Sequence, residues 1–513
     1  MFDRRFIIKW IMPNRIVLGS RSLVIEDVEE VARRDASVEF AEPAHARILL
    51  GRRKLEERLA GGDRIYGVNT GVGGNIKYGL DASETERFQE NLMKHLSCGT
   101  GAPLAPDVVR AAMLLRLATF ARGTSAVRWE LVEALTALLN RGIVPVVPRY
   151  GSVGASGDLM PSAYIARALS GMGQVDFEGR RMPAEEALRS AGLKTIRFAP
   201  KEGLALINGT TSMTAIAALL WIDAQRVLRA LLGAVALAIQ ALEAPSEAYQ
   251  PWVHESKGHP GQIEVAAYVR GLLAGSGFVK ESSSQSCYSL RCVPQGLGPA
   301  WEALESSRAT VEREINSAND NPLIDPDTGA LYRAGNFYGG HIARLLDSLK
   351  LDFAIQGNWG NSLFALLVDD RFNGGLPANL VREPGVNSGF KGMQLSVTSL
   401  ACAIRQMAGP SSIHSLPTEQ YNQDVVSLGM HAAVTAADAL ECLRNETAML
   451  LLAATQAVDL RGGSDRLGEG SRRVYDGVRQ VAAFLERDRA MEDSVTAVAA
   501  GIQTGRLGFD PLI

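Results

Sequence analysis

The stretch SMTAIAALLWIDAQRVLRALLGAVALAIQALE (residues 212–243) decides the fold class, because it is apolar on nearly every face of a helix. A surface helix keeps a charged face, whereas this pattern is typical of a helix inside a bundle. Its most apolar part, Ala230 to Ile239, is too short to span a bilayer. The segment therefore predicts a long buried helix in a mainly α-helical protein.

Helical spacing recurs on both sides of this segment. One helix is predicted between Pro43 and Gly61, and a second one before Gly142. Further along, Trp301 and Ile315 mark the ends of a single apolar stripe. Helices should therefore make up most of the chain.

Strand signals are few, namely a short strand at residues 15–18 and a hairpin around residues 177–179. Both fall in the first part of the chain. We therefore predict a smaller mixed domain over residues 1–206 and a long-helix bundle over residues 207–513.

Loops rich in Gly, Asn and Pro are predicted at 61–79, 142–161, 316–327 and 372–394. These loops hold a large share of the unusual short motifs in the chain. Such a distribution is typical of a rigid helical scaffold that carries its chemistry on connections.

Composition excludes several classes of protein. A net charge of −3 over 513 residues offers no basic field for nucleic acid. The five cysteines have no C-x-x-C pair and no zinc-type spacing with histidine, so we expect reduced thiols and no metal site. The apolar run FIIKWIM (6–12) is broken by Lys9 and does not resemble a signal peptide. We expect a soluble, cytoplasmic protein without membrane contact.

The sequence GSVGASGDL (151–159) carries the most specific chemistry. Taken alone, a Gly- and Ser-rich stretch predicts a turn. However, the unhindered nitrogen of Gly157 can close onto the carbonyl of Ala155, and loss of the Ser156 hydroxyl then leaves a ring with an exocyclic methylene. Such a ring is an electrophile, which no ordinary side chain provides.

Several other motifs appear in a fixed order with this stretch. They are YGVNTGVG (66–73), LINGTT (206–211), YSLRCVPQ (288–295), NDNPLID (319–325), GNF (335–337) and NQDVVS (422–427). This series resembles the ammonia-lyase and aminomutase family that uses the methylidene-imidazolone (MIO) group, which includes histidine, phenylalanine and tyrosine ammonia-lyases. The resemblance covers most of the chain, from about residue 66 to about residue 430.

The resemblance implies the cofactor, the assembly and the catalytic groups. It implies an MIO ring formed from Ala155–Ser156–Gly157, no external cofactor or metal, and a homotetramer whose active sites are built from several chains. Asn208 would support the ring, Tyr66 would be the base, and Tyr288 would lie near the ring. A phenol is a poor base at neutral pH unless nearby donors or positive charge stabilise its anion.

The substrate-binding residues are implied in the same way. Arg291 would hold the carboxylate of an amino acid with its planar fork. By resemblance, Gln285, Asn336 and Phe337 line the same region. Without the resemblance, a surface ion pair would be the favoured interpretation of Arg291.

Two positions predict which side chain the substrate carries. His95–Leu96 in NLMKHLSCG (91–99) is similar to the His-Leu of tyrosine-selective members, whereas phenylalanine-selective members have Phe-Leu and histidine-selective members Ser-His. A neutral imidazole can hydrogen-bond a para-hydroxyl group. Gln423 stands where histidine-type members carry Glu. The His95–Leu96 pair favours L-tyrosine, with 4-coumarate as the product, and Leu96 and Gln423 together argue against L-histidine.

Other positions depart from the family pattern, namely Val72, Met160, Ser162, Tyr164, Ser286, Cys287, Tyr338 and His341. None of them removes a catalytic group. Three alternatives therefore stay open: an aromatic 2,3-aminomutase, a phenylalanine or histidine ammonia-lyase, and a non-catalytic helical oligomer. The last is disfavoured because Tyr66, Ser156 and Arg291 are all present.

Overall fold

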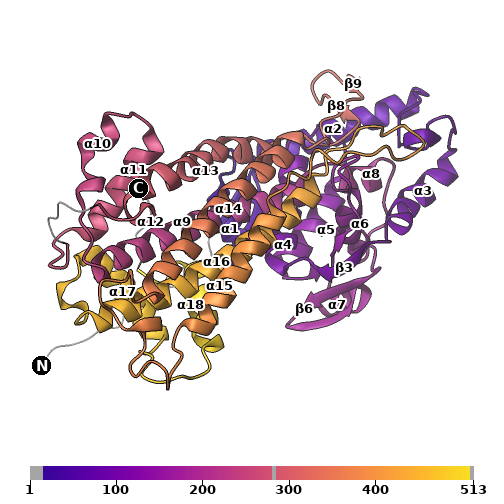
Figure 1. Ribbon diagram of the computed structural model, residues 1–513. Coiled ribbons are helices and arrows are strands. Elements are labelled where there is room, and N and C mark those ends of the chain that lie inside the picture. The colour runs from indigo at the N-terminus through magenta and orange to yellow at the C-terminus, as the bar shows by residue number, and fades with distance from the viewer. Residues whose placement is uncertain (1–14, 280–284, 509–513) are drawn as a thin grey trace, which may run out of the picture. The chain divides into compact units, whose positions relative to one another are not determined.

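The computed structural model describes residues 15–279 and 285–508, and these residues are mainly helical, as predicted (Figure 1). The apolar run at 6–12 lies outside the described residues. The chain divides into two compact units. Unit 1 consists of Met1–Leu219, Ala309–Arg344 and Ser411–Val434, and unit 2 of Leu220–Arg308, Leu345–Pro410 and Thr435–Ile513. The predicted boundary between an N-terminal domain (1–206) and a helix-bundle domain (207–513) stays a prediction.

Unit 1 combines short helices with small sheets. Its helices are α1 (Ile25–Arg33), α2 (Glu42–Ala60), α3 (Ala82–His95), α4 (Pro106–Phe120), α5 (Trp129–Asn140), α6 (Leu159–Leu169), α7 (Ala184–Ser190) and α8 (Glu202–Ile207). Its strands are β1 (Arg15–Leu18), β2 (Ser37–Phe40), β3 (Thr100–Pro103), β4 (Val144–Pro145), β5 (Pro148–Tyr150), β6 (Gln174–Phe177), β7 (Arg180–Pro183), β8 (Leu323–Ile324) and β9 (Leu331–Tyr332). Strands β1 and β2 pair in parallel, and β4, β6 and β7 form an antiparallel sheet in that order.

Most elements predicted from the sequence are confirmed. Helices α2 and α5 form where predicted, β1 covers the predicted strand, and β6 and β7 form the predicted hairpin. The loop predicted at 142–161 is wrong in part, because it contains β4, β5 and the first residues of α6. Proline supplies one residue of β4 and one of β5, and proline cannot donate to a strand ladder, so no strand pattern is visible there.

Long helices form most of unit 2. The boundary between the two units falls within four of them, so that each of these helices has residues in both units. They are α9 (Thr211–Ala241), α13 (Val293–Ile315), α14 (Gly340–Val368) and α16 (Gly429–Leu460). The others are α10 (Pro251–Glu255), α11 (Pro260–Leu273), α12 (Tyr288–Arg291), α15 (Lys391–Met407), α17 (Glu469–Val481) and α18 (Glu492–Thr504). Helix α9 confirms the buried helix predicted at 212–243. The loop predicted at 372–394 contains a short 3₁₀ helix and the start of α15.

Contacts within unit 2 hold α13 against α9 and against α14, three of the long helices drawn in Figure 1. The indole Nε1 of Trp221 on α9 donates to the carbonyl oxygen of Leu304 on α13 over 2.8 Å. A Cβ on Gly296 of α13 would lie 2.1 Å from the ring of Trp359 on α14, so glycine permits close packing there. No helix within the described ranges is long and apolar enough to cross a membrane.

A buried carboxyl group lies among these long helices. Glu446 on α16 is fully buried, and its oxygens lie close to Gly357 and Gly360 of α14. Burial raises the pKa of Glu446 to about 9, and the Asn361 amide and the Arg405 charge oppose this shift only in part. The folded protein therefore holds a proton here that the unfolded chain has lost at neutral pH.

We predict that Glu446→Gln stabilises the protein increasingly as pH rises. The pKa of Glu446 is higher in the folded protein than in the unfolded chain. As pH rises from the unfolded pKa to the folded one, the free energy of unfolding of the wild type therefore decreases by about 1.4 kcal/mol per pH unit. Thermal unfolding between pH 5 and pH 9 measures the difference. Glu441→Gln, an exposed position on the same helix, is the control. A constant difference across this range would contradict the prediction.

Candidate active site

One cavity of unit 1, of about 340 Å³, collects most of the predicted site residues. These are Tyr66, His95, Leu96, Ala155, Ser156, Gly157, Asn208 and Gln423. They come from the loop after α2, the end of α3, the loop before α6, the end of α8 and the segment between α15 and α16. Residues far apart in the sequence therefore meet around the Ala-Ser-Gly tripeptide.

Backbone contacts fix the tripeptide against the end of α8. The Gly209 amide donates to the Ser156 carbonyl oxygen over 3.2 Å, and the Asp158 amide donates to the Gly209 carbonyl oxygen over 2.7 Å. Gly157 has a φ of +73°, and a Cβ there would lie 2.0 Å from the Gly209 oxygen. Only glycine fits at this position.

Side chains complete the surroundings of the tripeptide. Gln423 Nε2 donates to Ser156 Oγ over 3.0 Å. Asn208 is buried, and its Oδ1 has no hydrogen-bond partner among the described residues. Asp158 is also buried, and burial raises its pKa to about 7. The backbone N–H groups of Met213 and Ser212 donate to the carboxylate and lower the pKa in part. A buried polar atom without a partner is costly, and Asn208 Oδ1 is one that also lies in a residue lining the cavity.

Tyr66 lies half-buried in the cavity and accepts a 2.9 Å hydrogen bond from the Gly73 amide. Burial is the largest cause that raises the pKa of Tyr66, the Gly73 donor lowers it, and the charge of Glu419 raises it further. The phenol is therefore held protonated by this unit alone. Its use as a base requires a nearby positive charge, and among the described residues none is a cause of the shift in its pKa.

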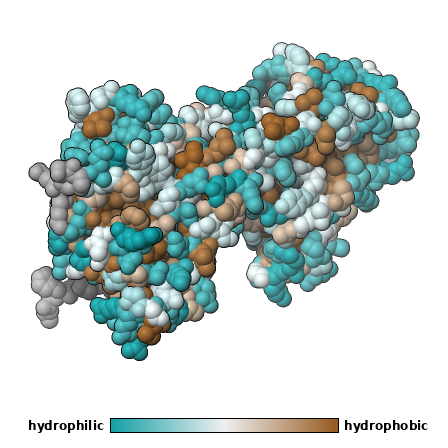
Figure 2. All heavy atoms as spheres, in the orientation of Figure 1, coloured by the Kyte–Doolittle hydropathy of each residue, from teal (hydrophilic) through white to brown (hydrophobic). Residues whose placement is uncertain are grey.

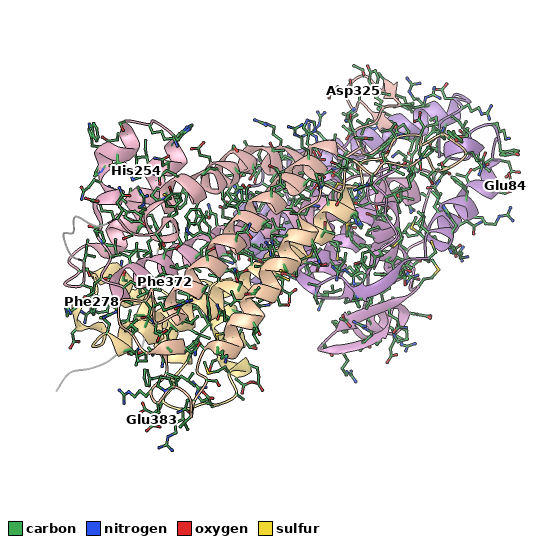
Figure 3. The ribbon with its side chains drawn as sticks, viewed as in Figure 1. Glu84, His254, Phe278, Asp325, Phe372 and Glu383 are labelled. Carbon is green, nitrogen blue, oxygen red and sulfur yellow. The ribbon has the colours of Figure 1, made fainter. Side chains whose placement is uncertain are left out.

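The helix that carries His95 is fixed at its start by a capping box. The Asp81 side chain accepts from the Glu84 amide over 2.9 Å, while the Glu84 carboxylate accepts from the Asp81 amide over 3.2 Å (Glu84 is labelled in Figure 3). At the other end, His95 Nδ1 lies 3.1 Å from the Asn91 carbonyl oxygen. A carbonyl only accepts, so Nδ1 carries a proton and Nε2 of the neutral ring is left as an acceptor.

A strained turn brings Glu419 into the cavity. Thr418 and Gln423 pair with each other, and the three residues that begin with Glu419 have φ values of +50°, +56° and +63°. Each left-handed residue costs about 1–2 kcal/mol, and such strain is concentrated at functional sites. A Cβ on Gly73 would lie 1.7 Å from Glu419 Oε2, so this glycine makes room for the carboxylate.

The remaining lining residues were not predicted as site residues. Those within the motifs quoted from the sequence are Gly73, Leu92, Cys98, Gly151, Ser152, Val153, Leu159 and Ile207, and Val72 and Met160 were noted as departures. Leu204, Thr418 and Glu419 lie outside all of these motifs and were missed. Glu419 is the most consequential, because it is a charged group. Its position four residues before Gln423 was the available signal, but a lone acid in a polar loop normally indicates solvent exposure.

Five predicted site residues are not among those that line this cavity. Asn336 lines another hollow of unit 1 and donates to the Ala318 carbonyl oxygen. Phe337, the next residue, is half-buried. Gln285 and Arg291 line a hollow of unit 2, and Tyr288 is exposed, with its ring 4.7 Å from the Arg291 guanidinium. Within the described ranges, no cluster of three His, Cys, Asp or Glu side chains is arranged to hold a metal ion.

We predict that Glu419→Gln lowers the pKa of Tyr66, because it removes the negative charge that opposes the phenolate. Ultraviolet difference titration measures this pKa. The titration of a protein with the additional change Tyr66→Phe is subtracted to remove the signal of the other tyrosines. Glu383→Gln, on an exposed loop of unit 2 (Figure 3), should leave the titration unchanged. A Tyr66 pKa that stays constant or rises in Glu419→Gln would contradict the electrostatic account.

Comparison with known proteins gives consistent matches over nearly the whole chain. The family model described as aromatic amino acid lyase matches residues 23–480. The chain is 38% identical to the histidine ammonia-lyase of Geobacillus thermodenitrificans, covering 95% of this chain and 97% of that protein. The structure is similar to the phenylalanine aminomutase of Pantoea agglomerans, with a TM-score of 0.91, 32% identity, and 96% and 99% of the two chains covered. It is equally similar to the tyrosine aminomutase of Streptomyces globisporus, with a TM-score of 0.91, 33% identity and coverage of 96% and 97%.

Proposed function

Because the chain belongs to the aromatic amino acid lyase family, we propose that it eliminates ammonia from L-tyrosine to give 4-coumarate. The observation that carries this proposal is the single cavity in which the Ala-Ser-Gly tripeptide lies together with Tyr66, His95 and Gln423. An elimination of ammonia needs an electrophile, a base and a pocket for the side chain. Each of the three has a candidate in this cavity.

We further propose that Ala155–Ser156–Gly157 forms the MIO ring, which supplies the electrophile once formed. The residues present fit this group, because Gly157 has no Cβ to hinder its nitrogen and Gln423 donates to the hydroxyl that must leave. A hydrogen bond to Ser156 Oγ makes that hydroxyl a better leaving group. The partnerless Asn208 Oδ1 is available to a substrate or to the ring.

The proposed active site draws on more than one chain, as the resemblance implies. Tyr66 needs a positive charge to ionise, and Arg291 would supply one from a neighbouring subunit. By resemblance, Gln285, Tyr288 and the pair Asn336–Phe337 would enter the site in the same way. This arrangement corresponds to a homotetramer with shared sites.

Exposed apolar side chains on unit 2 support the assembly. Leu351 and Ile355 are exposed one turn apart on α14, and Leu395 is exposed on α15. Figure 2 shows hydrophobic residues at the surface of this unit's long helices. Exposed apolar side chains of this kind are typical of an oligomer interface.

The tyrosine preference rests on His95. With Nδ1 donating to Asn91, Nε2 can accept a hydrogen bond from a para-hydroxyl group. The rest of the lining near it is largely apolar, including Leu92, Leu96 and Met160, and suits an aromatic ring. His95 is exposed in the single chain, so a phenyl ring would cost about 1–3 kcal/mol relative to a phenol only where the bound substrate excludes water from the imidazole.

Two alternatives have specific support. Similarity to a phenylalanine and a tyrosine aminomutase favours a 2,3-aminomutase, in which the amine is returned to the β-carbon. Similarity to histidine ammonia-lyases favours L-histidine as the substrate. Against histidine, Leu96 and Gln423 stand where histidine-selective members are expected to carry His and Glu.

A product assay with purified protein separates these possibilities. L-Tyr, L-Phe and L-His are supplied separately, ultraviolet absorbance follows the acrylate, and chiral chromatography detects the β-amino acid. We expect 4-coumarate from L-Tyr as the main product. β-Tyrosine as the main product would identify a mutase, and urocanate from L-His would overturn the tyrosine proposal.

We predict that Tyr66→Phe lowers kcat by about 10²-fold or more, because it removes the proton acceptor. The intact variant should be lighter than its own calculated mass by two water molecules, as the wild type should be, since the phenol is not needed for ring formation. The product assay and mass spectrometry measure both quantities. Near-normal turnover would remove Tyr66 as the base.

We predict that His95→Phe shifts the preference from L-Tyr towards L-Phe. The ratio of the two kcat/KM values should change by about tenfold or more, because the hydroxyl loses its partner while the phenyl ring gains an apolar contact. Steady-state kinetics with both substrates measure the ratio. An unchanged ratio would show that another residue sets the selectivity.

A further inference from the structure

A buried arginine lies directly behind the tripeptide. Arg116 on α4 is 3% exposed, and the guanidinium Nη1 donates to the Asn208 carbonyl oxygen over 2.8 Å. Its Nη2 donates to Thr211 Oγ1 over 3.4 Å. A buried charge is expensive unless its surroundings compensate it, so its position calls for an explanation.

Arg116 remains a cation at neutral pH. Burial lowers its pKa to about 10, and the charges of Asp320 and Asp158 oppose that shift. Asp320 is itself paired with the fully buried Lys201 over 2.6 Å, so it is not fully available to neutralise Arg116. A positive charge is thus maintained a short distance from the tripeptide.

The peptide unit between Asn208 and Gly209 connects this charge to the tripeptide. In a trans peptide the carbonyl and the N–H point in opposite directions. Here the carbonyl accepts from Arg116, while the Gly209 N–H donates to the Ser156 carbonyl oxygen over 3.2 Å. A cation at the carbonyl end polarises the peptide and strengthens the donor at its other end.

Packing leaves this peptide little freedom to move. A Cβ on Gly209 would lie 2.2 Å from Asn319 Oδ1 and 3.0 Å from Arg116 Nη2, and one on Gly157 would lie 2.0 Å from the Gly209 oxygen. The backbone of Gly209 is therefore held between Arg116 and Asn319 on one side and the tripeptide on the other. A shift of the guanidinium would be transmitted to Gly157.

We propose that Arg116 is a positioning residue for ring closure in Ala155–Ser156–Gly157, acting through the Asn208–Gly209 peptide. The inference rests on the proposed function, because it assumes that the ring forms. The guanidinium does not touch the reacting atoms. It fixes and polarises the donor that meets the Ser156 carbonyl oxygen.

The steps of ring formation show why this donor matters. The Gly157 nitrogen bonds to the Ala155 carbonyl carbon, and the Ala155 oxygen leaves as water with the amide protons of Gly157 and Ser156. The Ser156 hydroxyl then leaves as a second water with the Ser156 α-proton. Loss of the α-proton places negative charge on the Ser156 carbonyl oxygen, where the Gly209 N–H stabilises it.

The chain offers a matched control for this role. Arg110 lies on the same helix, is 8% exposed, and donates to the backbone oxygens of Val31 and Leu139. Replacing Arg110 therefore disturbs a buried arginine of α4 without touching the Asn208–Gly209 peptide. The same substitutions at both positions separate positioning from general destabilisation.

The experiment follows the intact mass of full-length protein over time after a short pulse of synthesis. The wild type should become lighter by two water molecules. Arg116→Lys should convert about tenfold more slowly or worse, and Arg116→Met should keep its full mass while its circular dichroism and thermal unfolding show a folded protein. Arg110→Lys and Arg110→Met should convert at the wild-type rate.

Each outcome has a definite meaning. Equal conversion rates for the Arg116 and Arg110 variants would overturn the role of Arg116 while leaving the proposed function intact. If Arg116→Met does not fold, the rates of Arg116→Lys and Arg110→Lys decide. A wild type that keeps its full mass would instead overturn the proposed function itself, and the role of Arg116 with it.

Discussion

The backbone contact between the tripeptide and the end of α8 is the constraint on which the site depends. Gly157 approaches Gly209 so closely that it has no room for a Cβ, and two hydrogen bonds connect Ser156 and Asp158 to Gly209. This contact orients the tripeptide towards the cavity that holds the polar side chains. It also places the buried charge of Arg116 one peptide away from the Ser156 carbonyl oxygen.

The cavity combines groups whose electrostatic preferences oppose one another. Glu419 disfavours the anion of Tyr66, and the left-handed turn that carries Glu419 is itself strained. Such an arrangement is unfavourable in an isolated unit and becomes reasonable if a cation completes the site. Arg291 of a neighbouring subunit is our candidate for that cation, which would oppose the rise in the pKa of Tyr66 that burial and Glu419 cause.

Much of the fold was predictable from the sequence, because apolar periodicity and glycine or proline boundaries determine helices such as α2, α5 and α9. The small sheets were harder, since β4 and β5 contain proline and lack alternation. Motif residues such as Ser156 and Gln423 were predictable as site residues. Glu419 and Arg116 were not, because only the folded chain reveals a buried charge or a strained turn; neither has a local sequence pattern.

The central claim is that the Ala-Ser-Gly tripeptide becomes the electrophile. The most direct test compares the intact masses of the purified wild type and Ser156→Ala with the masses calculated from their sequences. The account predicts a wild type lighter than its calculated mass by two water molecules, with the difference located in the peptide that contains Ser156, and a Ser156→Ala variant at its calculated mass. A wild type at its full calculated mass would contradict the account.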